Sequence, residues 1–395
     1  MADQFYFTRD TKVFLTPAGS TAVAWELPVL DGFSFSQATN TSEITLSEAT
    51  DSTGKSRRSR QLFTDSFAPA EWSFSTYMRP FGADPGTGTS LWEPSGSIAG
   101  RPQHCVEEAL WAYFVGAATF TLGASNTAST WDDGVTNNDT SVVIDWTASE
   151  KSSLTEFDIY VELGGATDGN DLTYKLGNCA VNEATIDFDI DGIATINWSG
   201  FAKTITDEGT NPPSFPASIS EGSTTTSNFI RNRLTTLTAT TADTTNFPGQ
   251  SSDGVYGLVL TGGSITISNN LTYLTPETLG IVNLPLGNVT GTRSVSGNFT
   301  CYLNHDTGAS ADLFEDLVEE TDVITNDFAL TLGIGGGSAP KVDIAMPNCH
   351  LELPTHSFDD VISVDVNFHA LPANIDPGST ADNYEVKVTY TGNDL

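Results

Sequence analysis

Acidic residues at alternate positions are the first candidates for chemistry in this sequence. The segment DFDIDG places Asp187, Asp189 and Asp191 before Gly192, as at the start of a calcium-binding EF-hand loop. Such a loop needs a bidentate carboxylate at its twelfth position, where this chain has Trp198. A spacing of two fits a β-strand, in which these carboxylates share one face. We therefore predict a strand and no calcium site.

The remaining motifs indicate no catalytic, metal or cofactor site. The chain has five histidines, and none shows the HxH or HExxH spacing of a zinc site. The glycine-rich segment 333–340 lacks the Lys-Ser/Thr pair of a phosphate-binding loop, so it is interpreted as a turn. No nucleophile elbow and no pair of catalytic carboxylates emerges. We predict that the protein is not an enzyme and that it has no catalytic, metal or cofactor residues.

The segment KSRRSR is a basic cluster in an acidic chain, with Lys55, Arg57, Arg58 and Arg60. Three roles are open: binding nucleic acid, lying free in solvent, or reaching an acidic surface on a neighbouring copy. We favour the third role as an inter-subunit loop. The chain has 50 acidic and 16 basic residues, a formal net charge of −34, so its copies repel each other. A basic loop would supply local attraction and fix the register between copies.

The overall charge argues against tight binding to DNA, because that binding needs clustered Lys and Arg to release counterions. Contact with DNA that must not adhere remains compatible with it. The longest apolar run, residues 109–120, is too short to span a bilayer, and no signal peptide is visible. The four cysteines form no CxxC pair, so we expect free, buried thiols and synthesis in a reducing cytoplasm.

A sequence repeat organises the elements that would position these residues. Residues 176–202 align without a gap with residues 346–372, at a shift of 170 that places Phe188 on Phe358. Apolar and polar residues alternate at the end of both copies, which indicates strands with one buried face. The same strand system is therefore predicted to occur twice.

The repeat sets the predicted domain limits in a chain long enough for two domains. We predict a first domain over residues 1–205, a Pro-, Ser- and Gly-rich linker over 206–227 and a second domain over 228–395. The composition is typical of a mainly β protein. Each domain is predicted to contain several strands, one α-helix and one long polar loop. The helices are expected at 104–116 and 310–320, and the loops at 40–70 and 271–295.

This order of elements resembles the tail tube proteins of long-tailed bacteriophages. The phrases that suggest it are ELPVLDGFSFSQATNTSE, APAEWSFSTYMRP and VNEATIDFDIDGIATINWSGFA in the first copy, and LTGGSITISNNLTYLTPETLG and PTHSFDDVISVDVNFHALP in the second. The resemblance covers nearly all of both copies. It implies that each domain is a β-sandwich or half-barrel with one flanking α-helix and one long extended loop. It also implies sheets that join side by side into a ring, rings that stack into a DNA-conducting tube, and long loops that reach an adjoining subunit or ring.

The resemblance also implies partners and a location. A trimeric ring with pseudo-sixfold symmetry is favoured, because each chain carries two domains; a hexamer with one copy as outer decoration is the alternative. The tube would join other tail proteins in the virion. Its subunits would be made in the host bacterial cytoplasm, and no membrane is expected as a partner. Viral DNA would pass through the tube without specific binding. The candidate lumen-facing acids share predicted polar strand faces: Glu156, Asp158, Asp187, Asp189, Asp191 and Asp365. The alternative function is a two-domain receptor- or carbohydrate-binding module of the virion surface.

Overall fold

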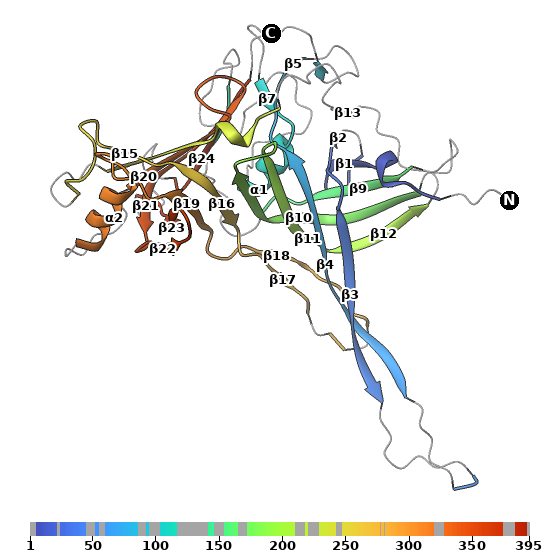
Figure 1. Ribbon diagram of the computed structural model, residues 1–395. Coiled ribbons are helices and arrows are strands. Elements are labelled where there is room, and N and C mark those ends of the chain that lie inside the picture. The colour runs from blue at the N-terminus through green and yellow to red at the C-terminus, as the bar shows by residue number, and fades with distance from the viewer. Residues whose placement is uncertain are drawn as a thin grey trace.

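Most of the chain folds into β-strands, with two α-helices among the described residues (Figure 1). The structure is a computed structural model. It describes residues 5–21, 24–44, 52–54, 60–85, 92–94, 103–116, 141–145, 154–164, 172–209, 218–219, 229–241, 247–276, 278–279, 281–319, 328–373 and 384–392. The predicted mainly β class is confirmed.

The first half of the chain, residues 5–219, forms two sheets that share the long strand β10 (Leu172–Asp189). The outer sheet has the order β13–β2–β1–β9–β10–β12, and the inner sheet has the order β3–β4–β11–β10. The bounds of the other strands are β1 Lys12–Pro17, β2 Ala24–Leu27, β3 Ser34–Ile44, β4 Gln61–Tyr77, β9 Phe157–Leu163, β11 Thr195–Ala202, β12 Thr204–Gly209 and β13 Ser218–Ile219.

The second half, residues 229–392, repeats this arrangement. Its outer sheet has the order β15–β14–β20–β21–β24–β8, and its inner sheet has the order β16–β19–β23–β22. Strand β8 (Ser141–Asp145) comes from the first half and completes this outer sheet. The bounds of the others are β14 Thr236–Thr241, β15 Val255–Gly257, β16 Leu260–Ser268, β19 Ser294–Tyr302, β20 Phe328–Ile334, β21 Lys341–Leu351, β22 Thr355–Phe358, β23 Ile362–Ala370 and β24 Lys387–Thr391.

The two inner sheets join edge to edge within one chain. Strand β10 pairs antiparallel with β16 from Glu183 opposite Ser268 to Asp189 opposite Gly262. This pairing, named here the internal seam, produces one continuous sheet, the shared sheet, in the order β3–β4–β11–β10–β16–β19–β23–β22. The halves are therefore not separate bodies, and one hydrophobic core runs through both of them.

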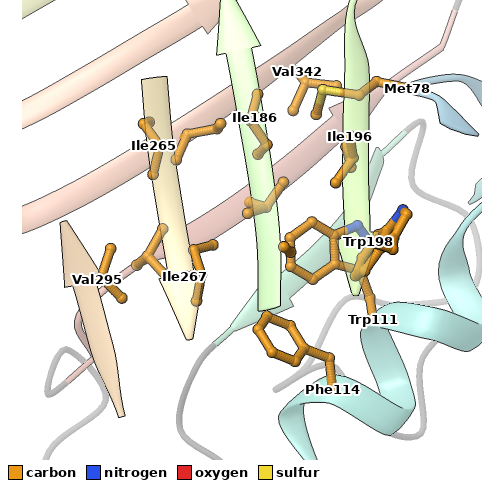
Figure 2. Packing of buried hydrophobic residues seen from close by; sticks show 14 of the residues in the cluster. Met78, Trp111, Phe114, Ile186, Ile196, Trp198, Ile265, Ile267, Val295 and Val342 are labelled. Atoms are coloured by element: carbon orange, nitrogen blue, oxygen red, sulfur yellow. The ribbon is translucent and has the colours of Figure 1, made fainter. Parts of the chain in front are cut away.

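Helix α1 (Glu108–Val115) lies in this common core, whereas α2 (Ser310–Glu319) has an exposed side. All eight side chains of α1 are buried, and the rings of Trp111 and Trp198 are 4.9 Å apart (Figure 2). The second half also covers this helix: Asn269 donates a hydrogen bond to the carbonyl of Phe114 over 2.9 Å.

Strands β3 and β4 continue beyond the sheet as a two-stranded arm that projects far from the rest of the molecule (Figure 1). The predicted loop over 40–70 is therefore largely strand, and its alternation was too weak to see in the sequence. The predicted loop over 271–295 contains the short pair β17 (Thr272–Leu274) and β18 (Gly287–Val289). A small sheet in the first half has the order β6–β5–β7, with bounds β5 Pro80–Pro85, β6 Trp92–Pro94 and β7 Gln103–Cys105.

The predicted linker, the cysteines and the helices can each be compared with the structure. Strand β12 runs to Gly209 and β13 pairs with β2 inside the predicted linker, so the boundaries at 205 and 228 stay predictions. All four cysteines are free and buried, as the sequence predicted. None of the described helices is long and apolar enough to cross a membrane.

Candidate functional site: the open face of the shared sheet

The shared sheet has one face against the core and one open face, because side chains alternate along every strand. Polar rows cross the open face from strand to strand. Ser75 donates a hydrogen bond to Asn197 over 2.6 Å, and Asn197 donates one to Asp187 over 2.9 Å. Across the internal seam, the hydroxyl oxygens of Thr185 and Thr266 are 3.3 Å apart. The open face is thus built of hydroxyl, amide and carboxylate groups.

Three of the six predicted acids lie on this open face. Asp187 and Asp189 alternate with the buried Ile186 and Phe188 on β10 and are exposed. Asp365 lies on β23 and accepts a hydrogen bond from Thr300 over 2.5 Å. The eight strands of the shared sheet contain no Arg, and their one Lys, Lys175, lies on the part of β10 that belongs to the outer sheet. The face is therefore acidic without compensating cations in its strands.

Asp191 lies nearby but in a turn rather than on the sheet. It follows the end of β10, and its Oδ1 is 3.6 Å from Nη1 of Arg233, with both side chains exposed. Gly192 follows with φ of 114°, a left-handed conformation that favours glycine in this turn. The DFDIDG segment is thus a strand end and a turn. Within the described residues, no group of three His, Cys, Asp or Glu side chains is placed to hold a metal ion.

Glu156 and Asp158 are not on the open face. Asp158 lies on β9 in the outer sheet and is only 1% exposed. It accepts hydrogen bonds from the backbone of Gly19 and Asn178, both 2.9 Å long, and forms an ion pair of 2.9 Å with Lys175. The sequence predicted a solvated acidic face on β9. Neighbouring strands instead enclose this carboxylate, so its polar partners are internal.

The Asp158–Lys175 pair is partly shielded from water. Burial lowers the pKa of Lys175, but the hydrogen bond and charge of Asp158 outweigh that effect and raise the pKa above its ordinary value. Glu156 accepts hydrogen bonds from Asn178 over 2.6 Å and from Asn288 over 3.4 Å. It therefore links the first half to the loop that precedes β19, and it has a structural role.

The basic cluster belongs to the arm. Lys55, Arg57 and Arg58 lie outside the described residues, while Arg60 directly precedes β4. Nη1 of Arg60 is 3.4 Å from Oε2 of Glu43 on the facing strand of the same arm. This exposed pair contributes little to stability. Of the cluster, the structure therefore places only Arg60, on the arm.

The loop of the second half crosses onto the first half. Backbone hydrogen bonds join Asn283 to Phe67 (2.9 Å) and to Asp65 (3.2 Å) at the root of the arm. The Tyr273 hydroxyl donates to the carbonyl of Asn178 over 3.0 Å. A long loop of one half therefore rests on the neighbouring half.

A buried polar link also joins the halves at α1. The indole N–H of Trp111 donates to the hydroxyl of Tyr390 over 3.0 Å, and that hydroxyl donates to Glu107. Burial raises the pKa of Glu107 to about 8, although the hydrogen bond from Tyr390 and the charge of Arg79 act to lower it. Tyr390 is on β24 of the second half, so this carboxyl group lies at the contact between the halves.

The internal seam and the last strand of the sheet carry equivalent phenylalanines of the repeat, and the exposure of these two side chains differs. Phe188 on β10 is 4% exposed, because β16 lies beside it. Phe358, its counterpart on β22, is 79% exposed. The sequence showed both residues but not which of them has a neighbour, because strand pairing is a long-range contact.

The comparisons with known proteins agree with this architecture. Residues 81–370 match the family model described as phage tail tube protein. The chain belongs to the phage tail tube protein family. It is also similar to the tail tube protein pb6 of Escherichia phage T5, with 27% identity over 380 residues. This alignment covers 94% of this chain and 73% of that protein.

This membership confirms the resemblance found in the sequence. The tail tube protein is a structural component of the phage virion, located in the tail. The mainly β fold agrees with this family, whose role is structural. The ring, its symmetry and the orientation of the open face follow as proposals.

Proposed function

We propose that this tail tube protein forms a ring in which the shared sheets of successive copies join edge to edge around a channel. The observation that carries the proposal is the internal seam: two strand systems of the repeat already join in this way within one chain. The open face, with Asp187, Asp189 and Asp365, would line the channel. Because like charges repel, such a wall lets duplex DNA pass without specific binding.

The two ends of the shared sheet support this closure. Among the described residues, no strand pairs with the outer edge of β3 or of β22. These strands are the counterparts of β16 and β10, which form the internal seam. Edge strands with unpaired backbone groups favour addition of another strand. A second copy placed with its β3 against β22 would repeat the internal seam and cover Phe358.

The shared sheet also bears on the number of chains in a ring. Both halves contribute four strands to one sheet, so neither half is left over as outer decoration. This supports three chains with pseudo-sixfold symmetry over a hexamer in which one half decorates the tube. Closed rings are the usual outcome of a contact that repeats with rotation.

The register of the proposed contact can be read from the repeat. Thr185 faces Thr266 in the internal seam, and Thr355 occupies the place of Thr185 at the shift of 170. Ser34 opposes Ser73, just as Ser264 opposes Asn298. Ser73 directly precedes Phe74, and Asn298 directly precedes Phe299, the counterpart of Phe74 in the repeat. Ser34 therefore corresponds to Ser264. Ser36, two residues further along β3, then corresponds to Thr266.

Cysteine cross-linking tests this register. Thr355→Cys and Ser36→Cys in one chain should form disulfides between copies, and the products should end at a covalent trimer on denaturing gels. The pair Thr185→Cys and Thr266→Cys is the matched positive control and should cross-link within one chain. Burial raises the pKa of the native thiols, so they react slowly.

Three results of the cross-linking would count against the proposal. If only the control pair cross-links, the seam between copies is absent. A ladder that continues to six chains would support a hexamer. A pair displaced to the core face, Thr355→Cys with Gln37→Cys, should not react, and efficient reaction there would refute the register.

The role of the open face is tested by charge reversal. Asp187→Lys and Asp189→Lys together should give assembled tubes that retain duplex DNA at low salt and release it as salt increases. The wild-type tubes should not retain DNA under the same conditions. Equal behaviour of the two proteins would mean that this face does not meet DNA.

A further inference from the structure

Equivalent segments lead into the two halves of the chain, and their side chains differ in exposure. Each segment contains a short 3₁₀-helix, Thr8–Asp10 in the first half and Asn232–Leu234 in the second. Strands β1 and β14 follow at the same shift of 224 and pair in the same way with β9 and β20. We name residues 5–10 the leading segment. The shift gives these equivalent pairs: Phe5 with Phe229, Tyr6 with Ile230, and Arg9 with Arg233.

The second-half segment is held against the first half by a contact that we name the internal clasp. The carbonyl of Ile230 accepts a hydrogen bond from the N–H of Ala194, which follows the turn after β10, over 2.9 Å. The ring of Phe229 lies edge-on to that of Tyr77, with centroids 5.4 Å apart. The guanidinium of Arg79 lies 4.4 Å from the centroid of Phe229. The internal clasp thus fastens the start of the second half to the end of β4 and β11.

A charged pair lies beside the internal clasp. Nη1 of Arg233, in the second-half segment, is 3.6 Å from Oδ1 of Asp191 in the turn after β10. Both side chains are exposed, so the pair adds little stability by itself. Opposite charges on facing elements nevertheless favour one arrangement over others. The internal clasp therefore combines an aromatic contact with a cation placed at an acidic turn.

The leading segment carries the same kinds of groups and exposes them to solvent. The side chain of Phe5 is 62% exposed, and that of Tyr6 is 45% exposed, whereas its counterpart Ile230 is 1% exposed. The Arg9 side chain is 79% exposed and has Asp10 of the same segment 3.7 Å away. The aromatic and cationic groups of the internal clasp are thus repeated at the start of the first half.

The second half contains the counterpart of the surface that receives the internal clasp. Backbone N–H groups donate over 2.9 Å at equivalent places in both halves: from Met78 to Ala194 and from Leu303 to Ile362. Tyr302, which precedes Leu303, therefore corresponds to Tyr77. In the same way, β4 pairs with β11 up to Tyr77, and β19 pairs with β23 up to Tyr302.

Tyr302 borders a hollow of about 820 Å³, which we name the turn-end hollow. Phe358 and the turn 359–361 also line it. Tyr302 is 40% exposed and Phe358 is 79% exposed. The turn supplies the carboxylates of Asp359 and Asp360, next to the hairpin that corresponds to the one with Asp191. The turn-end hollow thus offers an aromatic ring and an acidic turn, the two features that the internal clasp uses.

We propose that the leading segment of a second copy docks in the turn-end hollow, with Phe5 against Tyr302 and Arg9 beside the acidic turn. The proposal rests on the proposed function, because the second copy is the neighbour whose β3 would pair with β22. At the internal seam, the half that supplies β16 also supplies the internal clasp. The neighbour that supplies β3 would therefore supply the equivalent segment, and side chains would hold each joint of the ring at a second place.

Photo-cross-linking locates the leading segment in the assembled protein. With p-benzoylphenylalanine in place of Phe5, irradiated rings should yield an adduct on the peptide of Tyr302 or on residues 358–363 of a second copy. Rings assembled from isotope-labelled and unlabelled chains separate adducts between copies from those within one chain by mass spectrometry. The same photoreactive residue in place of Phe229 is the matched control, and it should attach to its own chain near Tyr77.

Single and double variants measure the strength of the contact. Phe5→Ala and Tyr302→Ala should each raise the dissociation constant between copies about tenfold, because an aromatic pair is lost. The double variant should be little weaker than either single variant. Phe229→Ala should instead lower the stability of the isolated chain. Leu234→Ala, at a side chain 55% exposed, is the control and should assemble like the wild type. Sedimentation velocity over a dilution series measures these constants.

A charge exchange tests the position of Arg9. Arg9→Glu should weaken assembly several-fold at low salt, because it places a carboxylate beside the acidic turn. Asp359→Lys with Asp360→Lys, added to Arg9→Glu in the same chain, should restore assembly. Arg233→Glu, at the internal clasp, is the matched control and should leave the dissociation constant between copies unchanged. Failure of the exchange to restore assembly would place Arg9 elsewhere.

The outcomes distinguish this inference from the proposed function. If Thr355→Cys and Ser36→Cys cross-link between copies but position 5 labels only its own chain, the inference fails and the proposed function stands. Fully additive effects of Phe5→Ala and Tyr302→Ala would show that these side chains do not meet. If the wild-type chain forms no rings, the proposed function and this inference both fail.

Discussion

The internal seam and the outer edge of β22 are the same structural element with and without a neighbour. At the seam, Phe188 is buried against β16; at the outer edge, Phe358 is exposed. The two helices differ in the same sense. The second half covers α1, whereas α2 keeps an open side. In the proposed ring, the neighbour that β10 finds within its own chain would be supplied to β22 by another copy.

The largest expected effect comes from removing the two phenylalanine side chains separately. Phe188→Ala should lower the free energy of unfolding by about 3–5 kcal/mol, because it leaves a cavity in the seam. Phe358→Ala should change the stability of the isolated chain little and should weaken ring formation instead. Urea unfolding and sedimentation of both variants check this. Equal destabilisation by the two changes would remove the distinction between the seams.

The next effect concerns a polar pair that only the first half has. Phe157 opposes Cys179 just as Phe328 opposes Cys349, so Asp158 and Lys175 stand where the second half has Ala329 and Ala345. Asp158→Ala should cost about 3 kcal/mol, because it leaves the partly buried Lys175 without its ion-pair partner and the N–H groups of Gly19 and Asn178 without this acceptor.

A double-mutant cycle sharpens that result. The combination Asp158→Ala with Lys175→Ala should be about as stable as Asp158→Ala alone, since the ion pair is already lost in the single variant. Urea unfolding of the wild type, both single variants and the double variant measures the coupling. Fully additive effects would show that the two side chains act independently. The ion pair would then give the first half no coupling energy that the alanines of the second half lack.

An effect that depends on pH is expected at the link between the halves. The pKa of Glu107 is raised from an ordinary 4.5 to about 8 in the folded chain. Between these values the unfolded chain releases this proton and the folded chain keeps it, so stability falls as the pH rises from about 4.5 to 8. Glu107→Gln should remove this fall, which amounts to about 1.4 kcal/mol for each unit between the two pKa values.

Thermal unfolding at pH 5 and pH 8 measures this effect. The wild type should lose more stability than Glu107→Gln between the two pH values, while Glu43→Gln, on the exposed arm, should follow the wild type. Parallel curves for the wild type and Glu107→Gln would mean that the carboxyl group is already ionised in the fold at pH 5.

The smallest effect is expected on the open face. Asp187→Asn and Asp189→Asn together should change the free energy of unfolding by less than about 1 kcal/mol, because exposed carboxylates contribute little to folding. A calorimetric scan of the monomer checks this. Destabilisation as large as that of Phe188→Ala would give these acids a role in folding and contradict the comparison of faces.

The sequence predicted the repeat, the mainly β class and the alternation that places Asp187, Asp189 and Asp365 on one face. These features depend on local period and on self-similarity, which are visible in one chain. The burial of Asp158 was not visible, because the residues that enclose it, Gly19 and Asn178, are distant in sequence.

The internal seam escaped sequence analysis for a related reason. The strands β10 and β16 were both predicted, but a strand pattern does not say which other strand lies beside it. One signal was available, the pair Phe188 and Phe358. Identical apolar residues at equivalent positions of a repeat indicate that both positions could pack against an equivalent neighbouring strand. The two helices did differ in sequence: residues 108–115 are apolar except for Glu108, whereas residues 310–319 contain four acids between their apolar residues, which is typical of a helix with an exposed side.

Because β10 and β16 belong to one polypeptide, their pairing does not depend on how many molecules are present. Tethered segments meet at an effective concentration near millimolar, far above that of separate proteins at low abundance. Half of the strand pairings between units in a ring of such chains would thus already exist in each newly folded molecule. Dilution would weaken only the pairings between chains. At low protein concentration, a ring of such chains would therefore close after fewer encounters between molecules than a ring of single-domain proteins.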